Sequence, residues 1–219
     1  MRGLASKNAL TKGRYRWLAI MAGTVGLAAV YWFPMRRRLS RWGATVDEIG
    51  RAMPGDELIK KPTRVGMQVV TINASPDQIW PWIAQMGDNR GGFYSYDSLD
   101  RLFGFLAHPS ATRILPEFQE LAIGDKILMG REVLTVSEVD PPRTLVLSYQ
   151  ARGLEWVWQF GLYPFDERHT RLVTRGTERS TSPAGWLLLQ AAEPAAFVMT
   201  TRMLSNLKRR VEGAGALAA

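Results

Sequence analysis

Two phenols and a carboxyl group lie close together in the sequence at Tyr94, Tyr96 and Asp97. Such groups can orient a polar group of a bound ligand, or transfer protons as general acids and bases. The same residues also suit the start of a helix, with Asp97 as the N-cap and the tyrosines packed against the core. Both interpretations follow from the sequence, which does not decide between them.

A second group of polar residues, Arg113, Glu117 and Gln119, precedes a series of predicted strands. Arg113 and Glu117 would form a charged pair at the mouth of a cavity if both side chains pointed inward. They would form a solvated surface pair, worth little free energy, if both pointed outward. We expect one of these two arrangements.

The sequence excludes Cys-dependent sites and contains no motif for a histidine metal site or a serine hydrolase. The chain contains no Cys, which excludes disulfides, thiolate metal sites, iron–sulfur clusters and Cys catalysis. Its two histidines, His108 and His169, are too few for a multi-histidine metal site. Neither accompanies a nucleophile-elbow Ser motif. The sequence therefore assigns no catalytic residue, no metal and no cofactor.

The formal net charge of +8 belongs to the N-terminal arm. Nine of the 28 basic residues lie in residues 1–41, which contain no acid, so the rest of the chain holds 19 basic and 20 acidic residues. A nearly neutral body does not suit a nucleic-acid-binding surface. A hydrophobic fraction of 46% suits an ordinary packed core and excludes wholesale disorder.

The arm contains an uncharged stretch, Trp17–Phe33, with arginines on both sides. Extended to about residues 17–35, it would be roughly 26–28 Å long as a helix, close to the thickness of a bilayer core. A buried core helix and a cleaved signal peptide are alternatives, but neither suits the bulky residues and arginines that follow. We predict a single-pass membrane anchor. Basic residues on both sides leave the orientation undetermined.

Helix-start signals follow the arm. Thr45 and Glu48 have capping-box spacing, and Ser75, Pro76 and Gln78 predict a helix over about 76–86. A further short helix is expected over 96–103, and a long one from Ser182 to about Glu212. The predicted organisation is a basic arm over 1–41, a short helix and linker over 42–65, a globular domain over 66–212 and a flexible tail over 213–219.

Strands are expected on either side of the shorter helices. Their predicted ranges are 66–73, 126–129, 131–139, 143–150, 154–163 and 170–178, the last five forming an antiparallel meander. In 154–163, side-chain alternation places Trp156, Trp158 and Phe160 on one face, and Glu155 and Gln159 on the other. The two tryptophans would belong either to the core or to the wall of a cavity.

The long C-terminal helix presents Met199 and Met203 on one face, because they are four residues apart. Methionine suits a wall that adapts to differently shaped ligands, since its side chain is unbranched and polarisable. Ordinary core packing is the alternative.

Local strings within residues 44–212 resemble the START/Bet v-type helix-grip superfamily, also called SRPBCC or polyketide cyclase/dehydrase-like, in its bacterial membrane-anchored branch. The most specific string is Arg90-Gly91-Gly92-Phe93-Tyr94-Ser95-Tyr96-Asp97. The others are Met53-Pro54-Gly55-Asp56-Glu57-Leu58, Ile79-Trp80-Pro81-Trp82, Gln85-Met86-Gly87, Pro116-Glu117-Phe118-Gln119, Gly124-Asp125, Phe197-Val198-Met199 and Met203-Leu204. Arg175 resembles an arginine common at that point of the family, with a structural or rim contact as its expected role.

The resemblance implies an α+β helix-grip fold, in which a curved antiparallel sheet wraps around the long C-terminal helix. It also implies a cavity between sheet and helix for a hydrophobic small molecule, lipid-like or polycyclic. The cavity candidates are Trp82, Tyr94, Tyr96, Asp97, Arg113, Glu117, Trp156, Trp158, Arg175, Met199 and Met203. A polyketide cyclase or dehydratase using the same cavity is the alternative, and a protein-contact subunit with a filled interior is a third. The sequence does not determine the oligomeric state.

Overall fold

The computed structural model describes residues 35–218 together with Gly23 and Gly26. Apart from those two glycines and Met35, the predicted membrane span over 17–35 lies outside the described residues. In the described part of the chain, no helix combines the length and the apolar character needed to cross a bilayer.

The chain divides into two compact units, Met1–Leu39 and Ser40–Ala219. In the first unit the structure describes a single short helix, α2, at Arg36–Leu39. The other elements described below belong to the second unit.

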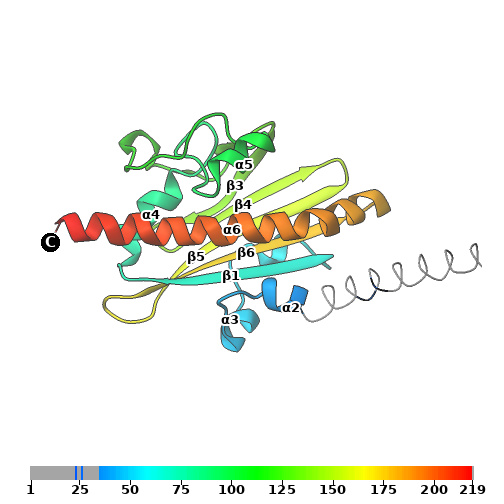
Figure 1. The fold of residues 1–219 in the computed structure, drawn as a ribbon, viewed down its shortest axis with the longest axis horizontal. Helices are drawn as coiled ribbons and strands as arrows, with labels where there is room; N and C mark the ends of the chain where they lie inside the picture. Colours follow the sequence, from blue (N-terminus) through cyan, green and yellow to red (C-terminus); the bar gives the residue numbers. More distant parts are fainter. Residues whose placement is uncertain (1–22, 24–25, 27–34, 219) are drawn as a thin grey trace, which may run out of the picture. The chain divides into compact units, whose positions relative to one another are not determined.

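The second unit is built on one six-stranded antiparallel sheet with the strand order β1-β6-β5-β4-β3-β2 (Figure 1). The strands are β1 Arg64–Ile72, β2 Lys126–Met129, β3 Glu132–Asp140, β4 Thr144–Ala151, β5 Leu154–Pro164 and β6 Thr170–Ser180. Strands β2 to β6 follow one another as hairpins, while β1 pairs with β6 at the edge. The predicted α+β class and the antiparallel meander are confirmed.

The helices begin where local capping signals predict. Helix α3 (Val46–Gly50) starts with a capping box in which the Glu48 N–H donates to Thr45 Oγ1 at 3.3 Å. Helix α4 (Pro76–Ala84) follows a second box at Ser75 and Gln78. The other elements are η2 Asp56–Leu58, α5 Asp97–Leu102, η3 Pro116–Phe118 and α6 Pro183–Ala218. Helix α6 thus continues past the predicted end at residue 212, because the glycines there weaken a helix without ending it.

The inner face of the sheet, defined as the face toward α6, forms the main core. Helix α6 packs against β1 and β6, with α4 beside it (Figure 1). The side chains of Trp158, Phe160 and Leu162 on β5 lie in one buried cluster with Met203 and Leu207 of α6. The predicted alternation therefore gives the correct face for each of these side chains, but burial does not alternate, because Val157 and Gln159 on the other face are buried as well.

The outer face is covered by a segment that precedes β1. Met53 packs with Met67, Val69 and Val173 in one buried cluster. Ile59 packs with Val146 and Val157 in another. The stretch expected to be a linker is therefore a layer on the sheet, because β5 and its neighbours present apolar side chains on both faces.

Three arginines spaced four residues apart on β6 point to the outer face, and each binds a carboxylate: Arg171 binds Glu48, Arg175 binds Asp56 and Arg179 binds Glu155. Arg175 is 6% exposed. Its Nη1 donates to both Asp56 oxygens at 2.8 and 2.7 Å, and its Nη2 donates to the Arg51 carbonyl at 2.7 Å. Gln159 also donates to Asp56, from Nε2 to Oδ1 at 2.8 Å. These bonds fasten the covering segment to the sheet.

Removing the carboxylate of Asp56 should unfold the outer layer first. Asp56→Ala leaves the buried guanidinium of Arg175 without a counter-ion. We expect a loss of about 3 kcal/mol, the lower end of the range for broken buried pairs, because the Asp56 side chain is itself 36% exposed. Glu155→Ala is the matched control, since it breaks an Arg–carboxylate pair on the same strand whose arginine side chain is 39% exposed. Urea unfolding should show a much smaller loss for this control. Equal losses would contradict a special role for Arg175.

Stability should fall in acid. The hydrogen bond from Arg171 holds the pKa of Glu48 below its ordinary 4.5, although burial opposes the shift. A carboxyl group with a lowered folded-state pKa stabilises the fold above its unfolded pKa, and this contribution is lost as pH falls through the folded value. The free energy of unfolding should therefore decline below about pH 4.5. In Glu48→Gln the decline should be less steep, and an unchanged slope would contradict this assignment.

Candidate functional site

An aromatic row runs along β5 on the inner face of the sheet. Trp158 lies 4.8 Å from Phe160 and 5.3 Å from Trp156, between ring centroids, and the two indoles stack at an interplanar angle of 23°. Trp158 Nε1 donates to Thr174 Oγ1 at 2.9 Å on β6. This bond satisfies the buried indole N–H and fixes the ring, so the row presents a rigid aromatic surface.

Trp156 is the partly exposed end of this row. A Cβ atom on Gly176 would lie 3.6 Å from Trp156 Nε1, so the indole lies over this glycine of β6. One face of its indole stacks on Trp158, and the residue as a whole is half-buried. The row therefore runs from a closed core to an accessible margin.

Helix α6 contributes an unusual polar group to its buried side. Leu189 and Gln190 are 8% and 5% exposed. Gln190 Oε1 is buried and receives no hydrogen bond from any described residue. A buried acceptor without a donor costs about 1–3 kcal/mol. Such an atom suits a donor supplied by a bound molecule.

Tyr94 occupies the closed part of the core. It is fully buried, adopts φ +60°, and its hydroxyl accepts a hydrogen bond from Gln85 Nε2 at 2.9 Å. Burial raises the pKa of the phenol, and the Gln85 bond and the charge of Arg210 offset only part of this. Asn206 Nδ2 donates to the Tyr94 carbonyl at 2.6 Å, tying this loop to α6. Tyr94 is thus a neutral phenol at physiological pH.

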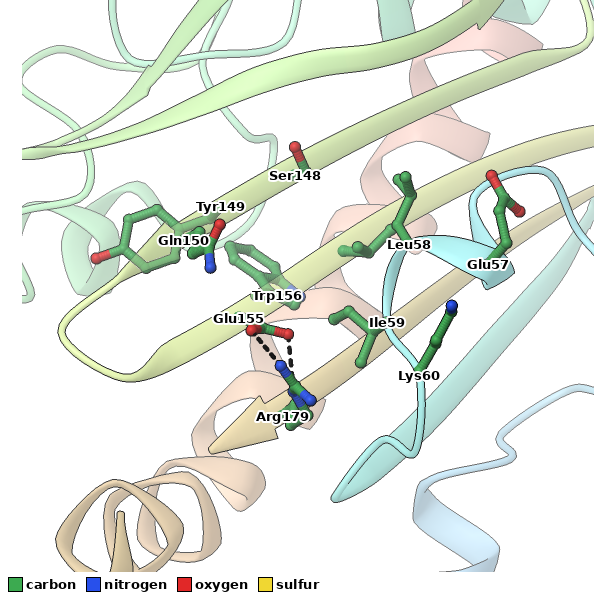
Figure 2. A pocket seen from close by; sticks show the side chains of 11 residues that line it. Glu57, Leu58, Ile59, Lys60, Ser148, Tyr149, Gln150, Glu155, Trp156 and Arg179 are labelled. Carbon is green, nitrogen blue, oxygen red and sulfur yellow. Dashed lines mark hydrogen bonds and ion pairs between the residues drawn. The ribbon is translucent and has the colours of Figure 1, made fainter. Parts of the chain in front are cut away.

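A groove of about 390 Å³ lies at the other side of the same strands (Figure 2). It is lined by Glu57, Leu58, Ile59 and Lys60 of the covering segment, by Ser148, Tyr149 and Gln150 of β4, and by Glu155, Trp156, Val157 and Arg179. Part of its polar lining is paired within the protein, as in Arg179 with Glu155 (Figure 2). In the described part of the chain, no cluster of His, Asp or Glu side chains could hold a metal ion.

The strand order, with α6 lying along the inner face, decides the architecture. The fold is a helix-grip fold. The expected resemblance to that superfamily is therefore confirmed for the arrangement of the elements.

Several solved structures are similar to this chain. A protein from Mesorhizobium loti aligns over 68% of this chain and 97% of its own, at 16% identity and a TM-score of 0.40. The Zhui aromatase/cyclase of a Streptomyces species aligns over 69% and 98%, at 18% identity and a TM-score of 0.40. An HSP90 activator from Plasmodium falciparum aligns over 58% and 85%, at 16% identity and a TM-score of 0.38. Neither the protein-family models nor the curated proteins give a match.

The helix-grip core brings together only part of the predicted site. The side chains of Trp82, Tyr94, Trp158 and Met203 lie in one buried cluster, with Trp156 packed against it. Trp82 meets Tyr94 edge to face, with ring centroids 5.9 Å apart. These aromatic residues and Met203 therefore share one core.

The other predicted residues lie elsewhere. Tyr96 is exposed, with the Arg202 guanidinium 5.0 Å from its ring centroid. Asp97 is the first residue of α5 rather than its N-cap, and its carboxylate accepts hydrogen bonds from the Ser110 N–H and hydroxyl at 3.1 and 2.7 Å. Both residues hold a loop in place.

Two predicted contacts are absent from the inner face. Arg113 and Glu117 are both exposed, and no ion pair joins these two described side chains, so they do not form a charged mouth. Arg175 points to the outer face and binds Asp56, which corrects its assignment to the cavity. Its partner could not be inferred because Asp56 lies 119 positions away in the chain.

Sequence reasoning missed the polar residues of the interior. Gln85, Gln190 and Asn206 are all buried. Gln190 and Asn206 follow or precede apolar positions of the α6 stripe, and a polar residue within such a stripe is the signal that could have found them.

The two methionines of α6 should respond differently to enlargement. Met203 is 2% exposed, so Met203→Trp overpacks a filled site and should cost about 1–3 kcal/mol. Met199 is half-buried, so Met199→Trp should leave the unfolding free energy nearly unchanged. Thermal and urea unfolding of both variants check this. A comparable loss for Met199→Trp would show that the space around Met199 is already filled.

Proposed function

We propose that the protein is a membrane-anchored module that binds a hydrophobic small molecule at the accessible end of its aromatic row, between the sheet and α6. The observation that carries the proposal is the stacked pair of Trp156 and Trp158, of which the outer indole remains partly exposed. Flat aromatic walls favour planar, polycyclic or long-chain apolar molecules. The wall is pre-formed, so a ligand need not order it.

Gln190 supports the same proposal. Ligand sites combine an apolar wall with a few polar groups that fix orientation. The buried Gln190 Oε1 lacks a donor among the described residues and can accept a hydrogen bond from a ligand hydroxyl. The preferred ligand is therefore largely apolar and carries at least one hydrogen-bond donor, such as a phenol or hydroxylated polycycle.

The anchoring part of the proposal rests on the sequence. An uncharged stretch of bilayer length over 17–33 is bracketed by arginines, and charged flanks of this kind hold a helix in a membrane. A hydrophobic ligand is available mainly in membranes, so an anchor keeps the binding domain near its source. We propose a bacterial cytoplasmic membrane as the location, with the ligand and the bilayer as partners.

A cyclase or dehydratase activity is the second candidate, favoured by Tyr94. A neutral buried phenol with a raised pKa is a potential proton donor in a closed site. The other expected acid–base groups do not join it, since Tyr96 and Glu117 are exposed and Asp97 binds Ser110. Binding without chemistry therefore has more support than catalysis.

Calorimetric titration of the detergent-purified full chain with hydroxylated polycyclic aromatics, quinones and fatty acids tests binding. We expect saturable binding, weakened about tenfold or more in Trp156→Ala, since stacking on an aromatic wall is worth about 1 kcal/mol beyond buried area. Gln190→Leu should weaken only ligands that carry a donor. Leu102→Ala, at a 74% exposed position on α5, is the control and should bind normally.

Absence of saturable binding for every probe would refute the binding function and favour a protein-contact role. Equal affinities for wild type and Trp156→Ala would place the ligand away from Trp156, and therefore also away from the groove of Figure 2, which this residue helps to line. Turnover of a polyketide-like probe that is lost in Tyr94→Phe would instead favour the enzyme.

A further inference from the structure

The two halves of α6 have opposite surroundings. In the C-terminal half, Met203, Leu204, Leu207 and Val211 are at most 4% exposed and belong to the core. In the N-terminal half, large apolar side chains face solvent: Trp186 is 47%, Leu187 63%, Leu188 66% and Val198 45% exposed. Exposed apolar patches of this kind are often sites of contact with another protein or with a membrane.

The exposed half carries almost no charge. Between residues 183 and 200 the single charged residue is Glu193. Its carboxylate lies 3.7 Å from Arg64 Nη1, and both side chains are 13% exposed. Smaller residues extend the patch, since Ala184, Ala191, Ala192, Pro194, Ala195 and Ala196 are also exposed. The half-helix therefore presents an apolar surface without a charged residue at its centre.

Three exposed cations lie at the end of the domain where this half-helix begins. The Thr181 N–H donates to the Gly153 carbonyl at 2.9 Å, which places the β4–β5 turn, with exposed Arg152, next to the beginning of α6. The Thr63 N–H donates to the Glu178 carbonyl at 2.8 Å, which brings exposed Lys60 and Lys61 to the same end of the sheet.

Carboxylates at this end are mostly neutralised. Glu178 and Glu193 are held by Arg64, and Glu155 by Arg179. The adjoining segment has one exposed acid, Glu57. The exposed cations at this end are three, namely Lys60, Lys61 and Arg152. The end of the domain at which the apolar patch begins, which we call the rim of the patch, thus carries net positive exposed charge.

We propose that the N-terminal half of α6, residues 183–198, lies against the surface of an anionic lipid bilayer. Trp186, Leu187 and Leu188 enter the boundary between headgroups and acyl chains, as the apolar face of an interfacial helix does. The rim cations contact anionic headgroups, which attract Lys and Arg side chains close to such a surface.

The chain length before the domain agrees with this arrangement. The proposed anchor ends at residues 33–35, and the second unit begins at Ser40. At most six residues intervene, and four of them form α2, so this segment spans less than the roughly 22 Å that six fully extended residues would reach. In this respect the inference rests on the anchoring part of the proposed function. A second copy of the chain fits the patch less well, because it would bring the same cations to the same rim.

Docking would also orient the ligand site. Gln190 lies on the buried side of the same half-helix whose exposed side carries Leu187 and Leu188. A bilayer against the exposed side would lie across the helix from Gln190, at about the diameter of a helix, 10–12 Å. A hydrophobic molecule could then pass between membrane and protein over a short path.

Because the chain contains no Cys, a single introduced Cys can be labelled specifically. Leu187→Cys in the full chain is labelled with an environment-sensitive fluorophore and reconstituted in vesicles of phosphatidylcholine and phosphatidylglycerol. We expect a blue-shifted label that is quenched by brominated acyl chains, and weaker quenching in phosphatidylcholine alone. Phe165→Cys is the control, because this 74% exposed residue follows the opposite end of β5 and should remain unquenched.

A second variant separates lipid contact from a general effect of the label. With the fluorophore at Val198→Cys, adding Leu187→Glu and Leu188→Glu should abolish most of the quenching, while Leu102→Glu should not. All these positions are exposed, so folding should be retained.

Equal quenching at 187 and 165 would overturn the proposal. A blue shift that rises with the number of protein copies per vesicle and is insensitive to brominated lipid would also overturn it, and would assign the face to a second copy. Alkaline carbonate extraction reports the anchor separately. If the chain is extracted, the anchor is refuted, and quenching on addition of vesicles still decides whether α6 docks. Ligand titration in detergent is independent of both results.

Discussion

The buried guanidinium of Arg175 holds the two layers of this domain together. It projects from the outer face of β6 and binds Asp56 and the Arg51 carbonyl, both in the segment that precedes β1. A guanidinium at 6% exposure is costly without a counter-ion, so the covering segment must be in place whenever the strand is. Gly55 makes the contact possible, since it adopts φ +88° and a Cβ there would lie 2.6 Å from Val146 Cγ1.

The same constraint reaches the candidate ligand site through β5. Gln159 on the outer face donates to Asp56 and to the Pro54 carbonyl, while its neighbours Trp158 and Phe160 point into the core. A strand whose alternate side chains are fixed on both faces cannot shift its register without breaking both layers. The stacked indoles therefore rest on a strand that is fastened from behind, which suits a pre-formed binding wall.

Helix α6 has one side toward the core that contains the aromatic row and another side toward solvent. Its C-terminal half closes the core, and Asn206 links it to the Tyr94 loop. Its N-terminal half has a buried side, where no described residue donates to Gln190 Oε1, and an exposed apolar side that includes Leu187 and Leu188. One helix thus supplies a lid for the proposed ligand site and a surface for the proposed bilayer contact.

The sequence by itself determined the features that depend on short-range chemistry. The boxes at Thr45 and Ser75 start helices because their partners lie three residues away, and the alternation around Trp158 follows from the period of a strand. These rules also identified the antiparallel meander, and the quoted strings identified the helix-grip resemblance.

Only the tertiary structure decided which groups meet across long chain separations. Arg175 finds Asp56 over 119 positions, and Asn206 finds the Tyr94 carbonyl over 112. It also decided that residues 53–59 cover the sheet, that Arg113 and Glu117 remain on the surface, and that one half of α6 is left uncovered. The physical reason is that burial depends on what packs against a residue. Composition and local periodicity describe a residue's own preference and not its distant neighbours.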